Sequence, residues 1–323
     1  MPADDIQQQL NKYLADAHSI EEQALVQLRK APNIAGNPEL AQTLSDHLTE
    51  TERHEELIRE RLDARGAGQS RFKDLIMAAT GVGFALFAKI QPDSPGKLAA
   101  HAYSYEHLEF ASYELLARVA EAAKDSETAA TARSIRDEEQ QTGERIARTF
   151  DAVAEASLFV TATSEPESAL LTYLADAHAL EAQAIQFLEG GSKSAGDTEL
   201  ERLLAEHLEE SRQHQALVEQ RLEAHDGSAS AIKDAALRLG AVNWSGFFVA
   251  QPDTPGKLAV FSYALEHLEI AGYELLKAVA RRADDHETVQ TANRILDQER
   301  AAATKIAATF DRAAEASLRA HKL

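Results

Sequence analysis

The sequence predicts an all-α protein built from two similar helical bundles in tandem, and three observations lead to this fold class. A shift of 160 positions places Tyr13–His18 on Tyr173–His178, and roughly 45 % of the aligned positions are identical, so the chain is an internal duplication. Ala, Leu, Glu and Arg are abundant, whereas Gly and Pro are scarce and recur at the same few places, as expected for helices joined by short loops. Each copy has about 150 residues, which is enough to bury a core of its own.

The charge of the chain excludes some classes of protein. Residues 1–160 contain 17 Lys and Arg against 27 Asp and Glu, and residues 161–323 contain 16 against 26, so both copies are equally acidic. Such a surface repels phosphate backbones and anionic lipid, which argues against nucleic-acid and membrane partners and favours metal ions and small molecules. Because the chain has no cysteine and its first residues lack the features of a signal peptide, we expect a cytoplasmic protein.

Four long amphipathic segments recur in each copy and predict its four helices. They lie near residues 5–30, 38–64, 97–123 and 126–157 in the first copy and near 165–189, 198–224, 257–283 and 286–318 in the second. The most apolar stretches, Leu75–Ile90 and Ala235–Ala250, fall between the second and third segments. They are too short or too polar to span a membrane, so we interpret them as buried connecting helices.

A repeated block precedes the third helix of each copy. Gln91–Lys97 (QPDSPGK) recurs as Gln251–Lys257 (QPDTPGK). Asp93 or Ser94 can cap the helix and Pro95 suits its first turn, so we interpret this block as a structural turn.

The order of the connections predicts how the helices are arranged. A short loop, a long crossover and a second short loop are typical of ferritin-like four-helix bundles, in which the crossover joins the second and third helices. We therefore expect one such bundle at residues 1–157 and another at 169–323, with residues 158–168 as the linker.

On the first two helices, polar residues that face the core are retained in both copies. Glu21 interrupts the apolar stripe of the first helix and recurs as Glu181, whereas its neighbour Glu22 became Ala182. On the second helix, three residues share one face because they are spaced three and four apart. They are His47, Glu50 and His54, retained as His207, Glu210 and His214.

The third and fourth helices carry further acids. On the third helix, Tyr103, Glu106, Glu109 or Phe110, and Tyr113 are spaced to share a face, and Tyr263, Glu266, Glu269 and Tyr273 repeat the pattern. His107 and Glu114 are expected to point elsewhere. On the fourth helix, Glu139 lies on the inward stripe and recurs as Glu299, whereas Glu138 became Gln298.

These inward acids predict a metal centre in each copy. One carboxylate from each of four helices cannot stay ionised in an apolar core without a counter-charge, because the desolvation penalty is several kcal/mol per ion. A pair of metal ions removes that penalty, and imidazole can complete the ligand set. Taken singly, each residue is also explained by a solvated helix face or by recent duplication; the full set on four helices, found twice, favours metal.

With these motifs the chain resembles the YciF-like family of ferritin-like proteins, a bacterial stress-associated group. The matching motifs are Glu21-Glu22-Gln23 on the first helix, His47 to Thr51 on the second, Glu106 to Tyr113 on the third and Asp137-Glu138-Glu139 on the fourth, each with its counterpart in the second copy. The resemblance implies that Glu21, Glu50, Glu109 and Glu139 bind metal with His47 and Glu106 nearby, as do Glu181, Glu210, Glu269, Glu299, His207 and Glu266. The Glu-x-x-His motif of many di-iron sites is missing, because Arg53 follows Glu50 and Thr142 follows Glu139; His54 and His214 add two candidate nitrogen ligands.

The leading functional hypothesis is a tandem protein with one dinuclear iron or manganese site per copy, which reacts with oxygen or peroxide and protects against oxidative stress. Tyr103 or Tyr113 can donate a proton or an electron there, although core packing also explains both. A second hypothesis is a metal-free interaction or scaffold protein whose buried acids are held by His and Arg. Iron storage in a cage is less favoured, because two fused bundles would have to reproduce a shell of single-bundle subunits. Enzymatic activity and a homo-oligomer stay open.

Overall fold

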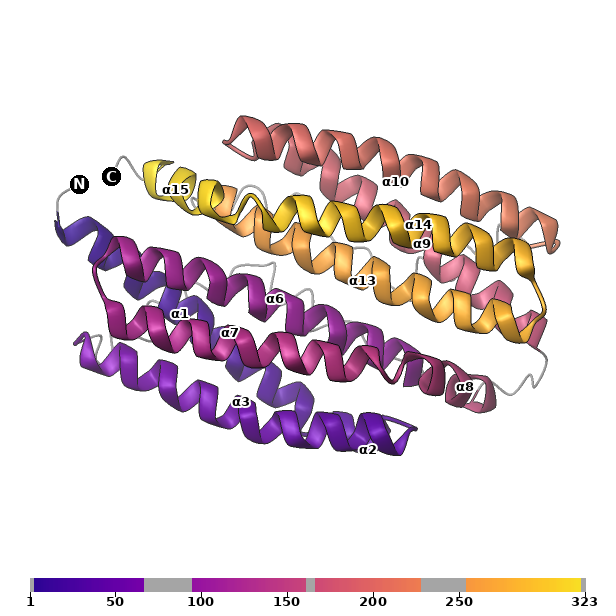
Figure 1. Cartoon of the computed structure of the whole chain (residues 1–323), viewed down its shortest axis with the longest axis horizontal. Helices are drawn as coiled ribbons and strands as arrows, with labels where there is room; N and C mark the ends of the chain where they lie inside the picture. The colour runs from indigo at the N-terminus through magenta and orange to yellow at the C-terminus, as the bar shows by residue number, and fades with distance from the viewer. Residues whose placement is uncertain (1–2, 67–94, 161–165, 228–253, 321–323) are drawn as a thin grey trace.

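The computed structural model describes residues 3–66, 95–160, 166–227 and 254–320, and within these ranges it contains helices and short connections but no strand. The all-α prediction is confirmed. The first copy contains α1 (Ala3–Leu28), α2 (Ala31–Ile34), α3 (Pro38–Ala64), α6 (Pro95–Ala122), α7 (Ser126–Ala147) and α8 (Phe150–Val160). The second contains α9 (Pro166–Ser194), α10 (Thr198–Ala224), α13 (Thr254–Arg282), α14 (His286–Ala307) and α15 (Phe310–Ala320). Four long helices form a bundle in each copy, and the two bundles lie side by side (Figure 1).

Polar side chains begin several of these helices. The Asn37 side chain accepts a hydrogen bond from the Leu40 amide at 3.0 Å at the start of α3. Asp125 does the same for Thr128 at the start of α7, also at 3.0 Å. Each contact satisfies an amide that has no partner within the helix. Asp93 and Ser94, the expected caps of the third helix, lie outside the described residues, as do the apolar stretches 75–90 and 235–250.

The fourth segment of each copy is broken into two helices, where the sequence predicted one continuous helix over 126–157 and 286–318. The break falls after Arg148 in the first copy and after Ala308 in the second. Thr149 is buried there, and its hydroxyl donates to the Ile146 carbonyl at 2.8 Å. Thr309 repeats the contact. The amides of Thr149 and Thr309 bond to the same carbonyls, at 2.9 and 2.8 Å, so the backbone at the break bonds to residue i−3 in place of i−4.

The segment expected as the linker, 158–168, contains the end of α8 and the start of α9. Residues 161–165 between them are outside the described part. Among the helices that the structure describes, none has the length and apolarity needed to cross a membrane.

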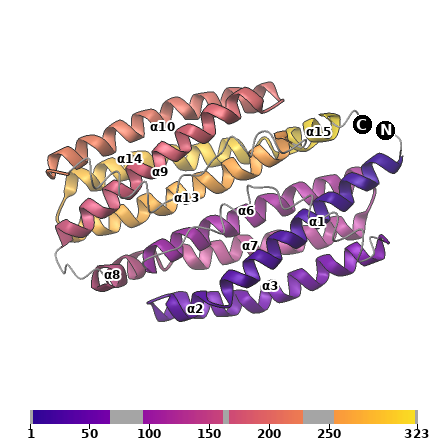
Figure 2. The same cartoon turned by 180° about the vertical axis from the view of Figure 1, so that it is seen from behind.

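The two bundles pack through α6 and α13, and α8 and α15 each contact both of these helices. From behind, α1 and α9 lie on the near side of their own bundles (Figure 2). Lys97 Nζ lies 2.9 Å from Asp176 Oδ2, and the equivalent Lys257 Nζ lies 3.4 Å from Asp16 Oδ2. Such reciprocal contacts are typical of a two-fold interface, so the chain packs like a dimer of its own two copies.

Two histidines mark the centre of this interface. The rings of His107 and His267 stack with centroids 3.6 Å apart. Burial lowers the pKa of His107 to about 4 and that of His267 well below its usual value, so both are neutral near pH 7 and do not repel each other. The sequence expected His107 to point away from the acids of its own bundle, and its side chain faces the other copy.

Candidate metal centre

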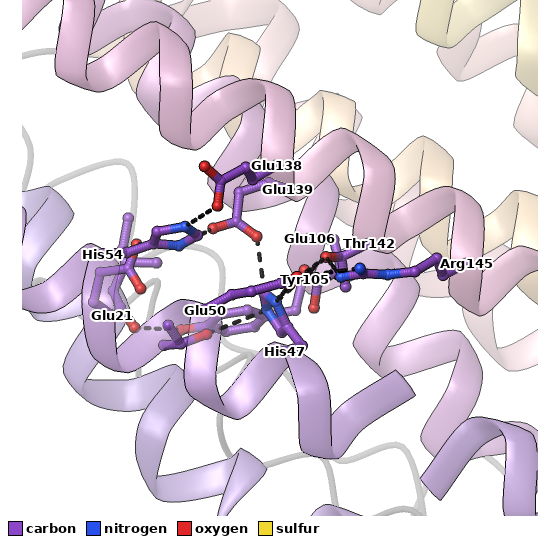
Figure 3. A network of polar contacts seen from close by, with 12 residues as sticks. Glu21, His47, Glu50, His54, Tyr105, Glu106, Glu138, Glu139, Thr142 and Arg145 are labelled. Carbon is purple, nitrogen blue, oxygen red and sulfur yellow. Dashed lines mark hydrogen bonds and ion pairs between the residues drawn. The ribbon is translucent and has the colours of Figure 1, made fainter. Parts of the chain in front are cut away.

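In the first bundle, carboxylates and imidazoles from four helices meet in the core. α1 supplies Glu21, α3 supplies His47 and His54, α6 supplies Glu106 and Glu109, and α7 supplies Glu139. All six side chains are buried. They form two groups, His47 with Glu106, Glu109 and Glu139, and Glu21 with His54 and Glu139; within each group, one ligand atom per residue lies within 4.8 Å of the others. Figure 3 shows most of them.

Glu139 belongs to both groups and lies between the two histidines (Figure 3). Its Oε1 is 2.8 Å from His54 Nδ1, and its Oε2 is 3.6 Å from His47 Nε2. One carboxylate that turns one oxygen toward each group has the geometry of a bridging ligand. The arrangement therefore places two groups of possible metal ligands side by side around one shared carboxylate.

The second bundle repeats the arrangement. Its two groups are His207 with Glu266, Glu269 and Glu299, and Glu181 with His214 and Glu299. Glu299 Oε1 is 2.8 Å from His214 Nδ1, and Glu299 Oε2 is 3.5 Å from His207 Nε2. The bridging position is thus conserved between the two copies in both sequence and geometry.

Several of the buried oxygens have no hydrogen-bond donor among the described residues. Both oxygens of Glu109 and both of Glu139 are in this state, and the same holds for Glu269 and Glu299. A buried polar atom without a partner costs on the order of 1–3 kcal/mol. Glu139 Oε1 lies 2.8 Å from His54 Nδ1, so a protonated His54 partly offsets this cost, whereas neither oxygen of Glu109 has an ion pair or a donor among the described residues. The donor set is therefore one that a cation would satisfy.

The pKa values in the first bundle show that Glu21 and Glu109 are poorly compensated without a cation, whereas burial is outweighed at Glu139, whose pKa is lowered by the charge of His47 and the contact with His54. Burial, followed by the charge of Glu139, raises the pKa of Glu21 to about 8. Burial raises the pKa of Glu109 well above its usual value, with Glu139 and Glu21 adding to the effect. Burial alone would lower the pKa of His54, but Glu139 and Glu21 raise it to about 9. Without metal, Glu21 and Glu109 are kept neutral by bound protons, and a metal ion would have to displace these protons.

Glu50 and Glu210 lie outside these groups, although the sequence proposed both as metal ligands. Glu50 is partly exposed and accepts from Arg145 at 3.1 Å, while its Oε2 is 3.2 Å from His47 Nδ1. Glu210 makes the same 3.2 Å contact with His207. Both glutamates thus bind the ring nitrogen that faces away from the buried acids. A carboxylate in this place orients an imidazole ligand and makes it more basic.

The sequence reasoning missed Glu138, which it set aside because the second copy has Gln298. His54 Nε2 is 3.0 Å from Glu138 Oε2, and His214 Nε2 is 3.2 Å from Gln298 Oε1. Both side chains present an oxygen that accepts from the histidine, so the change keeps the interaction. The shared acceptor oxygen was the signal that could have found this position.

Of the two tyrosines that the sequence singled out, Tyr113 is the one beside the acids. Its hydroxyl donates to Glu21, and Tyr273 donates to Glu181 in the second bundle. Tyr103 lies at the interface between the bundles, with its ring 5.7 Å from that of His267. All the other residues that the sequence proposed as ligands fall in the four groups.

Comparison with protein families agrees with this division of the chain. The family described as a domain of unknown function, DUF892, matches residues 5–158 and again residues 165–319. Each match covers one bundle and its pair of buried groups. No solved structure matches the chain.

Proposed function

The chain belongs to the DUF892 family, of which it contains two consecutive copies, and from this premise we propose that each copy holds a dinuclear iron or manganese centre. One metal position would use His47, Glu106 and Glu109, and the other would use Glu21 and His54. Glu139 would bridge the two. Carboxylates with a minority of imidazoles suit iron and manganese better than zinc or copper. This ligand set differs from the one that the resemblance to YciF-like ferritin-like proteins implies, because it contains His54 and not Glu50.

The observation that carries this proposal is the bridging position of Glu139, repeated by Glu299. When bound, the metal pair would supply the redox chemistry needed to reduce oxygen or peroxide in protection against oxidative stress. The side chains around the metal would hold the protons that the reaction needs. The Tyr113 hydroxyl donates a hydrogen bond to Glu21, and His54 Nε2 is hydrogen-bonded to Glu138. The bundle core keeps bulk water from the ligands, all of which are buried.

The alternative is a metal-free scaffold in which histidines and arginines hold the acids. Its support is the 2.9 Å pair between His47 Nε2 and Glu106 Oε2, which recurs between His207 and Glu266. The two oxygens of Glu109 oppose it, because no described residue donates to them. The metal proposal accounts for both observations.

Metal analysis after reconstitution with Fe(II) or Mn(II) tests the proposal. We expect about four metal ions per chain, two for each dinuclear site. Glu139→Gln should reduce the metal content of the first copy alone, and Glu299→Gln should reduce the metal content of the second copy alone. Glu52→Arg introduces the exposed residue that the second copy carries as Arg212, so it should leave the content unchanged.

The reaction is tested by exposing the Fe(II)-loaded chain to oxygen or peroxide and recording its absorption spectrum. An absorption band of an oxo-bridged iron pair is expected, and it should weaken in Glu139→Gln. A chain that retains no metal and shows no spectral change would favour the scaffold.

A further inference from the structure

A pocket of about 640 Å³ lies between the two bundles, and no residue of the metal groups lines it. Its walls come from α6, the end of α7, the start of α8, α13 and α14, whose packing Figure 1 shows. The volume is within the range of small-molecule sites, which commonly lie between domains.

Cationic side chains outnumber anionic ones in this pocket. The cations are Arg148, Lys277, Arg281 and Arg300, and the anions are Asp151 and Glu274. Glu274 pairs with both Lys277 and Arg300, and Arg281 Nη1 is 4.0 Å from Asp151 Oδ1. Arg148 forms no ion pair with any residue in the described ranges. The pocket is therefore positive, in a chain whose net charge is −20.

The internal duplication provides a control, because positions 160 residues away line the opposite side of the two-fold axis. The four cations correspond there to Ala308, Ala117, Glu121 and Gln140. The two acids are retained as Asp311 and Glu114, and Arg118 on that side pairs with both, at 2.9 and 2.7 Å. The four cations of the pocket are thus not repeated on the other side, where Arg118 and Arg136 pair with the acids, so packing of the two copies does not require them.

Aromatic rings form the rest of the wall. They are Tyr103, Phe150, Tyr263 and His267. Tyr103 meets Phe150 edge to face with centroids 5.3 Å apart, and Tyr263 lies 4.3 Å from His267. Both tyrosines are only half-buried, so part of each ring is free to contact a ligand. Such rings bind flat aromatic groups by stacking.

We infer that this pocket binds a small aromatic phosphate monoester, about the size of a nucleoside monophosphate. A phosphate dianion complements the excess of cations, and the exposed guanidinium groups of Arg148 and Arg281 can each bind it through two hydrogen bonds. The aromatic group would contact the exposed parts of the two tyrosine rings. A nucleic-acid strand is not the expected ligand, because the acidic surface around the pocket repels a polyanion.

Isothermal titration calorimetry of the full chain with adenosine 5′-monophosphate and with 4-nitrophenyl phosphate tests this site. We expect saturable binding with one site per chain. Arg148→Ala should weaken it about tenfold, as loss of one charge-assisted hydrogen-bonding group typically does. The fold already has alanine at the equivalent position 308, so this variant is expected to fold.

The double variant Arg148→Ala/Ala308→Arg is the matched control, because it moves one cation to the opposite side at constant net charge. It should bind as weakly as Arg148→Ala. Binding of the double variant at full strength, or no binding of either probe at millimolar concentration, would overturn the site. If adenosine binds as well as adenosine 5′-monophosphate, the phosphate part of the inference is wrong. If ribose 5-phosphate binds as well as adenosine 5′-monophosphate, the aromatic part is wrong.

Discussion

Glu109 shows how the candidate centre relates to stability at the scale of single residues. Its carboxyl group is fully buried, and neither oxygen has a donor among the described residues. A residue that served only the fold would be apolar in this position, because apolar packing costs no desolvation of a carboxyl group. The position is therefore better explained by binding than by folding.

Glu109→Leu should separate these two roles. We expect the metal-free variant to be more stable than the wild type by about 1–3 kcal/mol, because an unsatisfied buried polar group is replaced by an apolar one of similar size. Urea denaturation of both proteins in chelator measures this change, and metal content should fall in the first copy. A destabilised metal-free variant would contradict the prediction and assign Glu109 a structural role.

The stability of the metal-free protein should decrease as the pH rises from 6.5 to 9. The pKa of Glu21 rises to about 8 on folding, so the folded state holds a proton that the unfolded state has already lost. His54, with its pKa raised to about 9, contributes stability that is complete below 6.5 and is lost as the pH passes 9. The depressed pKa of His107, about 4, adds no slope in this range. Calorimetric melting temperatures across the range, with Glu21→Gln expected to flatten the decrease, measure the effect.

Most of the candidate site could be predicted from the sequence because the duplication separates retained residues from changed ones. That criterion selected Glu21, Glu106, Glu109 and Glu139, which all lie in the metal groups. Retention in both copies could not distinguish Glu50 from a metal ligand, because a residue that orients His47 is retained as strongly as one that binds metal. Retention also excluded Glu138, because Gln298 is a different residue, although its side chain offers the same acceptor oxygen.

At the scale of elements, the two copies differ where α3 faces the fourth helix. In the first copy, Arg145 on α7 donates to Glu50 on α3 and to Thr142, at 3.1 and 2.6 Å. In the second copy, Lys305 replaces the arginine and forms no hydrogen bond within the described part of the chain, and Ala302 replaces the threonine. The first pair of helices is thus tied together beside its histidine, and the second is not.

This difference predicts unequal rates of metal uptake. Arg145→Lys should speed uptake by the first copy, because the Glu50 carboxylate is released and α3 can separate more easily from α7. Lys305→Arg should slow uptake by the second copy. Stopped-flow measurements of Mn(II) or Fe(II) binding follow both variants. Equal rates in the wild type and both variants would show that this contact does not control access.

The positions of the long helices were predicted well from periodicity, and the break in the fourth segment of each copy was not. The amphipathic pattern continues through Thr149, so periodicity does not show the break, at which Thr149 bonds to the Ile146 carbonyl through both its amide and its hydroxyl. The short α2 likewise has too few residues for a period to be recognised.

At the scale of the whole molecule, the two most strongly repeated blocks of the sequence meet each other. Asp16 belongs to the block Tyr13–His18, and Lys257 belongs to the block that the sequence analysis interpreted as a turn. They form one of the reciprocal pairs between the copies, and Lys97 with Asp176 forms the other. The sequence could not show this, because residues retained for the interface and residues retained for a turn look alike within one chain. These blocks are therefore retained at the contact between the copies, and the buried acids are retained inside the bundles.

Lys257→Met should consequently destabilise the chain more than Lys97→Met. The side chains of Lys257 and Asp16 are 8 % and 9 % exposed, whereas the side chains of Lys97 and Asp176 are 22 % and 14 % exposed. Removing one partner of a buried ion pair costs about 3–5 kcal/mol, and less when the pair is more exposed, so the less exposed pair should lose more. Urea denaturation of the two variants compares these costs. The reversed pair Asp16→Lys/Lys257→Asp should recover part of the loss; a reversed pair no more stable than Lys257→Met would show that the lysine acts through packing and not through its charge.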